Sequence, residues 1–588
     1  MKMRNLLGLL FIFGCMCLCN SCNNRLNDGE YNLELYAQND IHGRYFDSLY
    51  IEDAEKLSVA NVSEYLNLRR DLLGKENIIA IDNGDHLQGD IAAYYYNYVY
   101  DYTIAENKKH LFAQICDFVD FDAVVVGNHD IEAGHQNYDV LKKDLKSAGI
   151  PYLAANAIDE STSLPYFEPY TILNKGGVKV ALIGMTNPAI KKWLPEHLWK
   201  GLNFLPIQDL AQELIDNVTK EHNPQLVVLA IHAGVGDSTP ENIENPGKYL
   251  ASVLKGVDII ISAHDHRVAC EKIYNGTDSV LVLDGGSHCN YLSNANIKIV
   301  VKDNKVVEKS IEGNIISMSD VAKDNNYLNK FRWAYSNVKN YTNTVIGKLD
   351  KDLYTRDAFF GPSDYINLIH TVQLDKTGAD ISFAAPNTYN SYLPAGDLLR
   401  SDLFILYPFE NTLFKINMSG KQIKDYLEFS YDKWICTVKS NGDHIFNMQY
   451  SEKDGVGRYW FKNMAFNFDA AAGINYIVDI TKDNGNRISI SSLHDGTKFS
   501  MDSTYTVAIN SYRASGGGDL LKLGAGIDPQ TELEGITLGV YPEVRNLIDE
   551  YFKNNPEGSI KYYSNWKFGP DNIAIQAIKR DRKLLFQD

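Results

Sequence analysis

The stretch Ile78-Ile79-Ala80-Ile81-Asp82-Asn83-Gly84-Asp85 decides the fold of the first half of this chain. Its apolar part is too short for a helix and runs straight into a polar turn, which predicts a buried strand that ends in an acidic loop. Similar short apolar runs occur at residues 33–37, 123–126, 226–231 and 259–261. Helical stretches separate them, and strands that alternate with helices predict a layered α/β architecture.

The turns after these runs carry side chains that can bind metal ions. Carboxylate and neutral imidazole suit zinc, manganese or iron, and the amide oxygen of Asn suits a harder ion. Because ligands gather at the carboxyl ends of strands in such sheets, we expect the turns to meet at one sheet edge. Asp85 is the candidate for a carboxylate shared by two metals about 3.5–4 Å apart. The candidate ligands are Asp40, His42, Asp85, Asn128, His232, His264 and His266.

Each turn also has a purely structural explanation. A single Asp-x-His at a strand end is usually a capping Asp and a hydrogen-bonded His, and a single Gly-Asn-His-Asp is usually only a turn. His232 alone would more often be a core histidine than a ligand. The recurrence of such turns, each directly after an expected strand, favours one shared metal centre.

The length of 588 residues indicates more than one domain. Residues 30–315 are expected to form the α/β domain, and 344–570 a separate α+β domain. The polar segment between them, 316–343, is expected to be a helical connector. In the second domain, helices are expected at 365–373 and 420–431, and strands at 412–418, 474–480 and 505–509.

Residues 1–22 predict an export signal. Lys2 and Arg4 precede an apolar run that is too short to span a bilayer. Ser21-Cys22 resembles the end of a bacterial lipoprotein signal, so we expect a lipid on Cys22 and a periplasmic or surface-exposed protein of the cell envelope. A plain secretory signal is the alternative. We expect a monomer that meets the membrane only through this anchor.

The net charge of −18 argues against duplex nucleic acid as a partner, since such binding relies on Lys and Arg. It leaves small anionic substrates possible, because bound divalent metals can reverse the local field.

The ordered motifs resemble those of the calcineurin-like metallophosphoesterases. Two later segments, 407–413 and 510–518, resemble the C-terminal domain of the exported 5′-nucleotidase and 2′,3′-cyclic-nucleotide phosphodiesterase family. The resemblance implies a metallophosphoesterase domain with β-sheets flanked by helices, followed by a separate 5′-nucleotidase C-terminal domain. The first set of motifs is Asp-x-His at 40–42, Gly-Asp at 84–85, Gly-Asn-His-Asp at 127–130, His232 and His-x-His at 264–266.

The resemblance also implies ligand sets for two divalent metal ions, with zinc or manganese expected. One set is Asp40, His42, Asp85 and His266, and the other is Asp85, Asn128, His232 and His264.

His129 matches the catalytic histidine of the family. The family orients this histidine with an acidic residue three positions on, where this chain has Glu132. Asp130, next to His129, is the alternative partner.

The resemblance places substrate selection in the second domain. Phe409 and Tyr512 fall where two aromatic rings of the family sandwich the nucleobase, and Asn411 matches a base-contacting Asn of some members. Without the resemblance, both rings would be interpreted as core residues. The segments 516–519 and 384–394 depart from the 5′-nucleotidase form, which leaves specificity for 5′-monophosphates open.

The implied activity is hydrolysis of nucleotide phosphate esters by in-line attack of metal-bound hydroxide. The substrate is a 5′-nucleotide, or a 2′,3′-cyclic nucleotide together with 3′-nucleotides. A UDP-sugar hydrolase or another ester hydrolase of the superfamily is the alternative. A surface-anchored binding protein on this scaffold is a third hypothesis, but it predicts lost ligands, whereas every ligand position is filled.

Overall fold

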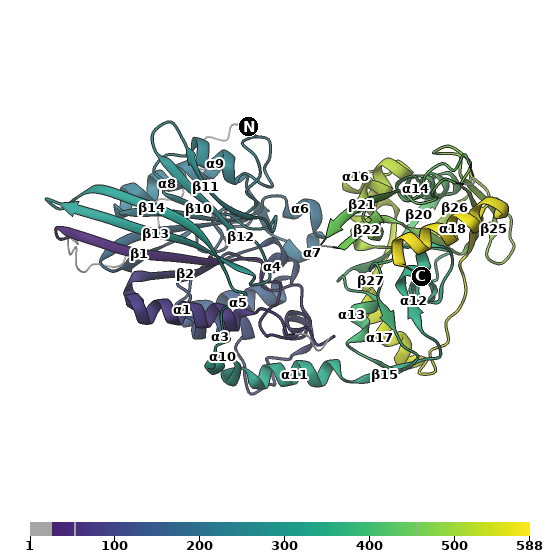
Figure 1. Cartoon of the computed structure of the whole chain (residues 1–588), viewed down its shortest axis with the longest axis horizontal. Coiled ribbons are helices and arrows are strands. Elements are labelled where there is room, and N and C mark those ends of the chain that lie inside the picture. Colours follow the sequence, from purple (N-terminus) through teal and green to yellow (C-terminus); the bar gives the residue numbers. More distant parts are fainter. Residues whose placement is uncertain (1–25, 52–54, 441, 454–455, 588) are drawn as a thin grey trace. The chain divides into compact units, whose positions relative to one another are not determined.

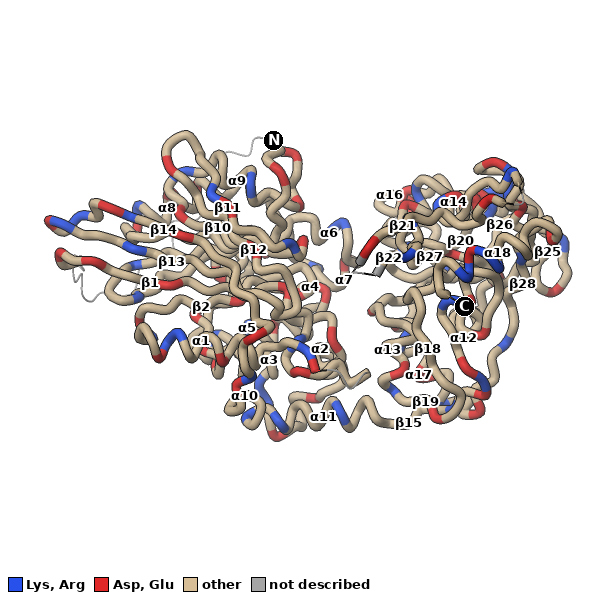
Figure 2. The backbone as a smooth tube through the Cα atoms, in the orientation of Figure 1, with Lys and Arg blue, Asp and Glu red and all other residues tan. Residues whose placement is uncertain are grey.

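The structure is a computed structural model that describes residues 26–51, 55–440, 442–453 and 456–587 (Figure 1). The expected signal at 1–22, with Cys22, lies outside the described residues. The chain divides into two compact units, Met1–Val338 and Lys339–Asp588. Acidic and basic residues are interspersed along both units (Figure 2).

The N-terminal unit is built on two six-stranded sheets, ordered β14-β13-β1-β2-β3-β4 and β11-β12-β10-β9-β7-β6. The central strands of each sheet are parallel. The first sheet comprises β1 (Gly29–Gln38), β2 (Ile78–Asp82), β3 (Ala123–Val125), β4 (Tyr152–Leu153), β13 (Tyr291–Lys302) and β14 (Lys305–Ser317). The second comprises β6 (Tyr170–Lys175), β7 (Val178–Thr186), β9 (Leu226–His232), β10 (Ile259–Ile261), β11 (Val268–Tyr274) and β12 (Ser279–Gly285).

The expected apolar runs are strands, but the expectation of one sheet edge is wrong. The sequence patterns identify strands and do not reveal which strands pair. Alternate residues of both sheets form one buried core, in which Leu35 and Ile79 of the first sheet pack with Val228 of the second. The candidate ligands therefore come from the adjoining edges of two packed sheets.

Helices cover the outer faces of these sheets, which completes the layers (Figure 1). On the second sheet, α8 (Ile207–His222) and α9 (Gly247–Val253) pack their apolar sides against β7, β9 and β12. In α8, Ile207, Ala211 and Ile215 are buried at helical spacing. On the first sheet, α1 (Val59–Leu73) and α5 (His135–Ala148) contact β2 and β4, and α3 (Leu111–Val119) packs on α5.

The segment expected to connect two domains contains α10 (Asn325–Lys330) and α11 (Arg332–Thr342). Tyr327 and Phe331 are buried, and the Tyr327 hydroxyl donates to the Tyr45 carbonyl at 2.8 Å. The first part of this segment therefore packs within the N-terminal unit. Among the helices that the structure describes, none is long and apolar enough to cross a membrane.

The C-terminal unit is an α+β structure with a five-stranded sheet, β23-β17-β26-β20-β27, and a three-stranded sheet, β25-β24-β28. Trp434 is fully buried at the end of α14 and stacks on Tyr431 and Phe468. Phe586 of α18 joins this core, so the unit extends past residue 570. The elements are α12 (Asp364–Thr377), β17 (Ile381–Ala384), β20 (Thr412–Ser419), α14 (Gly420–Trp434), β23 (Ala470–Ala472), β24 (Ile474–Asp479), β25 (Ile488–Leu493), β26 (Thr504–Asn510), β27 (Thr537–Glu543), β28 (Asn565–Gly569) and α18 (Asp571–Phe586).

The two units confirm the predicted fold class. A layered α/β domain of sheets flanked by helices is followed by a separate α+β domain.

Candidate functional site

Strained backbone conformations bring the candidate ligands of the N-terminal unit together. Residues other than Gly rarely adopt positive φ angles, and they keep them only where the surroundings enforce it. The turns after β1, β2 and β10 concentrate such residues. They are Asp40 (φ 49°), His42 (φ 46°), Asp85 (φ 58°), His264 (φ 77°) and His266 (φ 54°).

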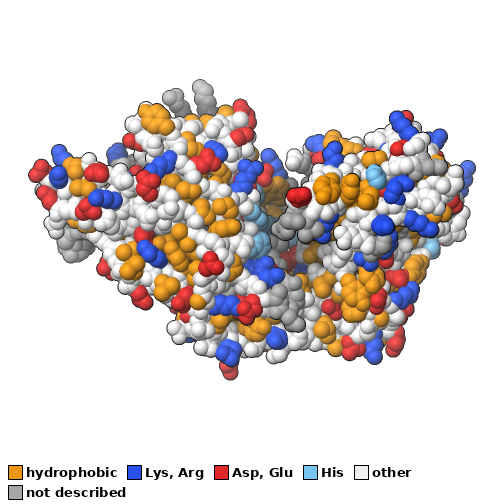
Figure 3. Space-filling view, in the orientation of Figure 1, with side chains coloured by type: hydrophobic (Ala, Val, Ile, Leu, Met, Phe, Trp, Pro, Cys, Tyr) orange, Lys and Arg blue, Asp and Glu red, His pale blue; other side chains and the backbone are white. Residues whose placement is uncertain are grey.

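The seven candidate ligands form two adjacent clusters. Asp40, His42 and His266 offer ligand atoms within 4.8 Å of one another, and so do Asp85, His232 and His264. The His232 Nε2 atom lies 3.1 Å from Asp85 Oδ2 and 3.8 Å from Asp40 Oδ1, so it links the clusters. Asn128 joins the second cluster, with Oδ1 2.8 Å from His264 Nδ1. Histidine side chains, pale blue in Figure 3, reach the surface of this unit.

The hydrogen bonds of the imidazoles fit metal ligation. His42 Nδ1 lies 3.2 Å from the Gln88 carbonyl, and His232 Nδ1 lies 2.7 Å from the Asn83 carbonyl. A carbonyl accepts only from N–H, so in the neutral imidazole each Nε2 keeps its lone pair for the cluster, as in metal-binding histidines. The fully buried Nε2 of His232 faces Asp85 Oδ2 at 3.1 Å, so a divalent cation between the two side chains would be held by an imidazole nitrogen and a carboxylate oxygen.

Two glycines allow this close packing. A Cβ on Gly127 would lie 2.2 Å from Asp85 Oδ1, and a Cβ on Gly84 would lie 2.5 Å from His232 Nδ1. Gly84 also has a φ of 94°, which side chains disfavour.

His129 lies beside the clusters at the start of α4 (Asn128–Glu132). Its backbone N–H donates to Asp85 Oδ1 at 2.8 Å, and its Nδ1 forms a short hydrogen bond with Glu132. Burial opposes the charged imidazole, but the carboxylates of Asp85 and Glu132 outweigh it and raise the pKa of His129 to about 10. Of the two acidic candidates, Glu132 is the one that contacts this ring.

Asp130, the other candidate, has a different task. Its buried carboxylate accepts backbone N–H groups from Gly127 (2.7 Å) and Asp85 (3.1 Å) on one oxygen. The other oxygen accepts from His86 (2.9 Å) and Leu87 (3.0 Å). Asp130 therefore ties the turn that carries Asp85 to the turn that carries Asn128.

Two histidines near the clusters were not predicted from the sequence. His86 is fully buried, stacks on Phe112 at 4.0 Å and lies 3.1 Å from Asp82 Oδ1. The His288 N–H donates to the Asp40 carbonyl at 2.9 Å, and its ring lies 5.3 Å from that of His42. A signal for His288 existed, because it follows the apolar run 280–283, just as the predicted ligands follow theirs.

In the C-terminal unit, the predicted base-binding residues lie near one another. Phe409 and Asn411 precede β20, and Tyr512 lies on α15 (Ser511–Ala514). The Ser511 hydroxyl donates to Asn411 Oδ1 at 3.4 Å, which links the two segments. Phe409 is 38% exposed and Tyr512 39%, so neither is a core residue. Exposed aromatic rings of this kind are available to stack on a ligand.

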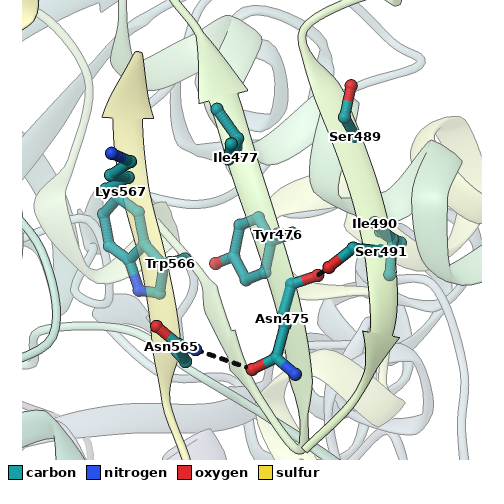
Figure 4. Close-up of a pocket in the computed structure, with 9 residues that line it drawn as sticks. All are labelled: Asn475, Tyr476, Ile477, Ser489, Ile490, Ser491, Asn565, Trp566 and Lys567. Carbon is teal, nitrogen blue, oxygen red and sulfur yellow. Dashed lines mark hydrogen bonds between the residues drawn. The ribbon is translucent and has the colours of Figure 1, made fainter. Parts of the chain in front are cut away.

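The predicted residues are not part of the shallow pocket on the three-stranded sheet, whose lining residues Figure 4 shows. Its polar rim includes Asn565, which donates to Asn475 at 2.9 Å. Beneath this rim, Tyr476 and Trp566 stack on each other at 5.8 Å.

Both halves of the chain match known families. Residues 35–268 match the calcineurin-like phosphoesterases, and residues 345–523 match the 5′-nucleotidase C-terminal domain. The protein is therefore a metal-dependent phosphoesterase. It combines a calcineurin-like phosphoesterase domain with a 5′-nucleotidase C-terminal domain. Such enzymes use two divalent metals, and the two clusters match that requirement.

Curated relatives cover most of the chain. It is 24% identical to the 2′,3′-cyclic-nucleotide 2′-phosphodiesterase/3′-nucleotidase of Salmonella typhimurium, over 84% of this chain and 82% of that protein. It is 24% identical to the 5′-nucleotidase of Vibrio parahaemolyticus, over 76% of this chain and 85% of that protein. Identity to the trifunctional nucleotide phosphoesterase protein YfkN of Bacillus subtilis is 26% over 92% of this chain, which spans only 39% of that protein.

A solved structure shares the fold. The putative 5′-nucleotidase from Staphylococcus aureus superposes with a TM-score of 0.70 at 20% identity, and the match covers 91% of this chain and 99% of that one.

Proposed function

We propose that this protein hydrolyses phosphate esters of nucleotides. It acts as a 5′-nucleotidase, or as a 2′,3′-cyclic-nucleotide 2′-phosphodiesterase with 3′-nucleotidase activity. The observation that carries the proposal is the pair of adjacent His and carboxylate clusters. The exposed rings of the C-terminal unit and the nucleotidase activities for which the relatives are named support a nucleotide as the substrate.

Seven side chains would hold the two metal ions, and zinc or manganese suits them. Asp85 would be shared by both sites. When bound, the two cations neutralise phosphoryl oxygens and lower the pKa of the attacking water. With Asp85 as the shared ligand that the family resemblance implies, one site would use Asp40, His42, Asp85 and His266, and the other would use Asp85, Asn128, His232 and His264.

His129 acts on the substrate directly. Glu132 holds its Nδ1, and the Asp85 carboxylate holds its backbone N–H, so the ring has a fixed position. Its Nε2–H then donates to a phosphoryl oxygen or to the leaving oxygen, where negative charge develops.

Phe409 and Tyr512 bind the base by stacking on its faces, and Asn411 contacts its edge. Stacking tolerates different bases and contributes about 1–3 kcal/mol per base. These residues favour a nucleotide over phosphate esters that lack a base, and they discriminate less strongly between one base and another.

The test is a kinetic comparison of AMP, 3′-AMP, 2′,3′-cyclic AMP and UDP-glucose, with chelated and metal-restored protein. We expect one or more of the first three to be hydrolysed, only with metal, and the reaction to be lost in His129→Ala. The matched control is His197→Ala, which removes an exposed histidine of α7 (Glu196–Trp199). Preference for UDP-glucose would favour the UDP-sugar alternative, and nucleotide binding without turnover would favour a binding protein.

We also propose that the protein is exported and anchored through a lipid on Cys22, and that it is a monomer. The signal-like pattern of residues 1–22 supports export. Cys22→Ser should release the protein from the membrane fraction, whereas a plain secretory protein would be unaffected by this change. Sedimentation of the protein without residues 1–22 tests its oligomeric state.

A further inference from the structure

We propose that Phe466 forms a third wall of the base-binding site, beside Phe409 and Tyr512. The Phe466 ring centroid lies 6.0 Å from that of Phe409, with 71° between the ring planes. It lies 6.1 Å from the Tyr512 centroid, with 77° between the planes. Phe466 therefore stands edge-on to both rings and connects them. This inference rests on the proposed function.

A buried ion pair fixes the Phe466 backbone. Arg513, the neighbour of Tyr512, and its partner Asp469 are each 2% exposed and form a bidentate pair at 2.7 and 3.0 Å. The same guanidinium donates to the Phe466 carbonyl at 2.6 Å and to the Asn467 side chain at 2.9 Å. A rigid bidentate pair of this kind holds the loop of Phe466 at a set position next to Tyr512.

The backbone at Gly517 restricts the position of the Tyr512 ring. A Cβ on Gly517 would lie 2.4 Å from Tyr512 Cε2, so the glycine backbone packs directly against the ring. Arg513 also donates to the Gly517 carbonyl at 3.0 Å, which ties this glycine to the same ion pair. The Arg513 guanidinium thus positions both Gly517, which packs against Tyr512, and the loop of Phe466.

The three rings favour a flat aromatic ligand. A base stacked on Phe409 or Tyr512 presents its edge to a ring that stands roughly perpendicular to both, and edge-to-face contact is a favoured aromatic geometry. The third wall also shields one edge of the stacked base from water. Phe466 thus contributes affinity for nucleobases and adds nothing for an ester that lacks one.

The test is the binding of adenosine to the full chain, measured by calorimetry. Adenosine carries no phosphate, so its binding reports on the base-binding site separately from the metal centre. Phe466→Ala should weaken binding by about 3- to 10-fold, the range of an edge-to-face aromatic contact. It should also raise KM for the nucleotide substrate more than it lowers kcat. Phe466→Leu, which keeps the bulk, should fall between Phe466→Ala and the wild type.

Met464→Ala is the matched control, since Met464 lies two residues away and is 66% exposed. It should bind adenosine like the wild type. Thermal unfolding checks that each variant is folded, and Phe466→Leu keeps the test valid if Phe466→Ala is not. The third wall is refuted if Phe466 variants bind adenosine normally while Tyr512→Ala does not. If the wild type neither binds adenosine nor hydrolyses nucleotides, the proposed function fails, and the third wall fails with it.

Discussion

Asp130→Asn removes one acceptor oxygen from the carboxylate that ties two metal-binding turns together. The carboxylate receives four backbone N–H groups, two on each oxygen. Asn keeps one oxygen, and its amide NH2 then faces the other two donors. A buried hydrogen bond to a charged group contributes about 1.5–3 kcal/mol, so losing two costs about 3–6 kcal/mol. This is a large part of the roughly 5–15 kcal/mol that stabilises a typical protein.

The cost falls on the turns that carry Asp85 and Asn128, so metal binding should weaken together with stability. Residues that support metal ligands typically contribute about 10–100-fold to metal affinity. Titration calorimetry of the chelated protein with Mn²⁺ or Zn²⁺ measures this, and thermal unfolding measures the stability. Asp216→Asn, which changes an exposed carboxylate of α8, is the control. Unchanged metal affinity and unchanged unfolding in Asp130→Asn would refute the role of Asp130 in tying the two turns together.

Three further predictions concern the same centre. His129→Ala should lower kcat by about 10²–10⁴-fold with metal content retained, whereas Asp85→Asn should lower both, as kinetics and metal analysis would reveal. Gly127→Ala places a methyl group 2.2 Å from Asp85 Oδ1 and should weaken metal binding in calorimetry; normal binding would show that the turn can relax. Glu132→Gln removes a carboxylate that raises the pKa of His129, so the imidazolium should be lost at lower pH, and the alkaline limb of the kcat profile should shift to lower pH. An unmoved limb would mean that another group titrates there.

The sequence predicted the strands and the chemistry of the turns well. The run 78–81 is short and apolar and becomes β2, and the polar residues that follow it supply Asp85. The spacing of apolar residues and the composition of turns are local properties, so they can be recognised without knowledge of the fold. The pairing of strands is not local. The alternate apolar residues of β1 and β9 fit either one sheet or two, and only the packing of the whole unit decides between them.

Supporting residues were harder to predict than ligands. From the sequence, Asp130 was a possible partner for His129 because the two residues are adjacent. The sequence does not reveal that the Asp130 carboxylate accepts four backbone N–H groups. Its four backbone donors come from two turns that are distant in the chain, one at residues 85–87 and the other at Gly127. Phe466 lacked a signal for the same reason, since its neighbours Phe409 and Tyr512 lie in distant segments.

The number of divalent ions per chain needed for activity tests the central claim most directly. The chelated protein is titrated with Mn²⁺ or Zn²⁺ while nucleotide hydrolysis is followed. The two clusters predict that the rate reaches its plateau at two equivalents of metal per chain. A plateau at one equivalent, or full activity without metal, would contradict a two-metal centre.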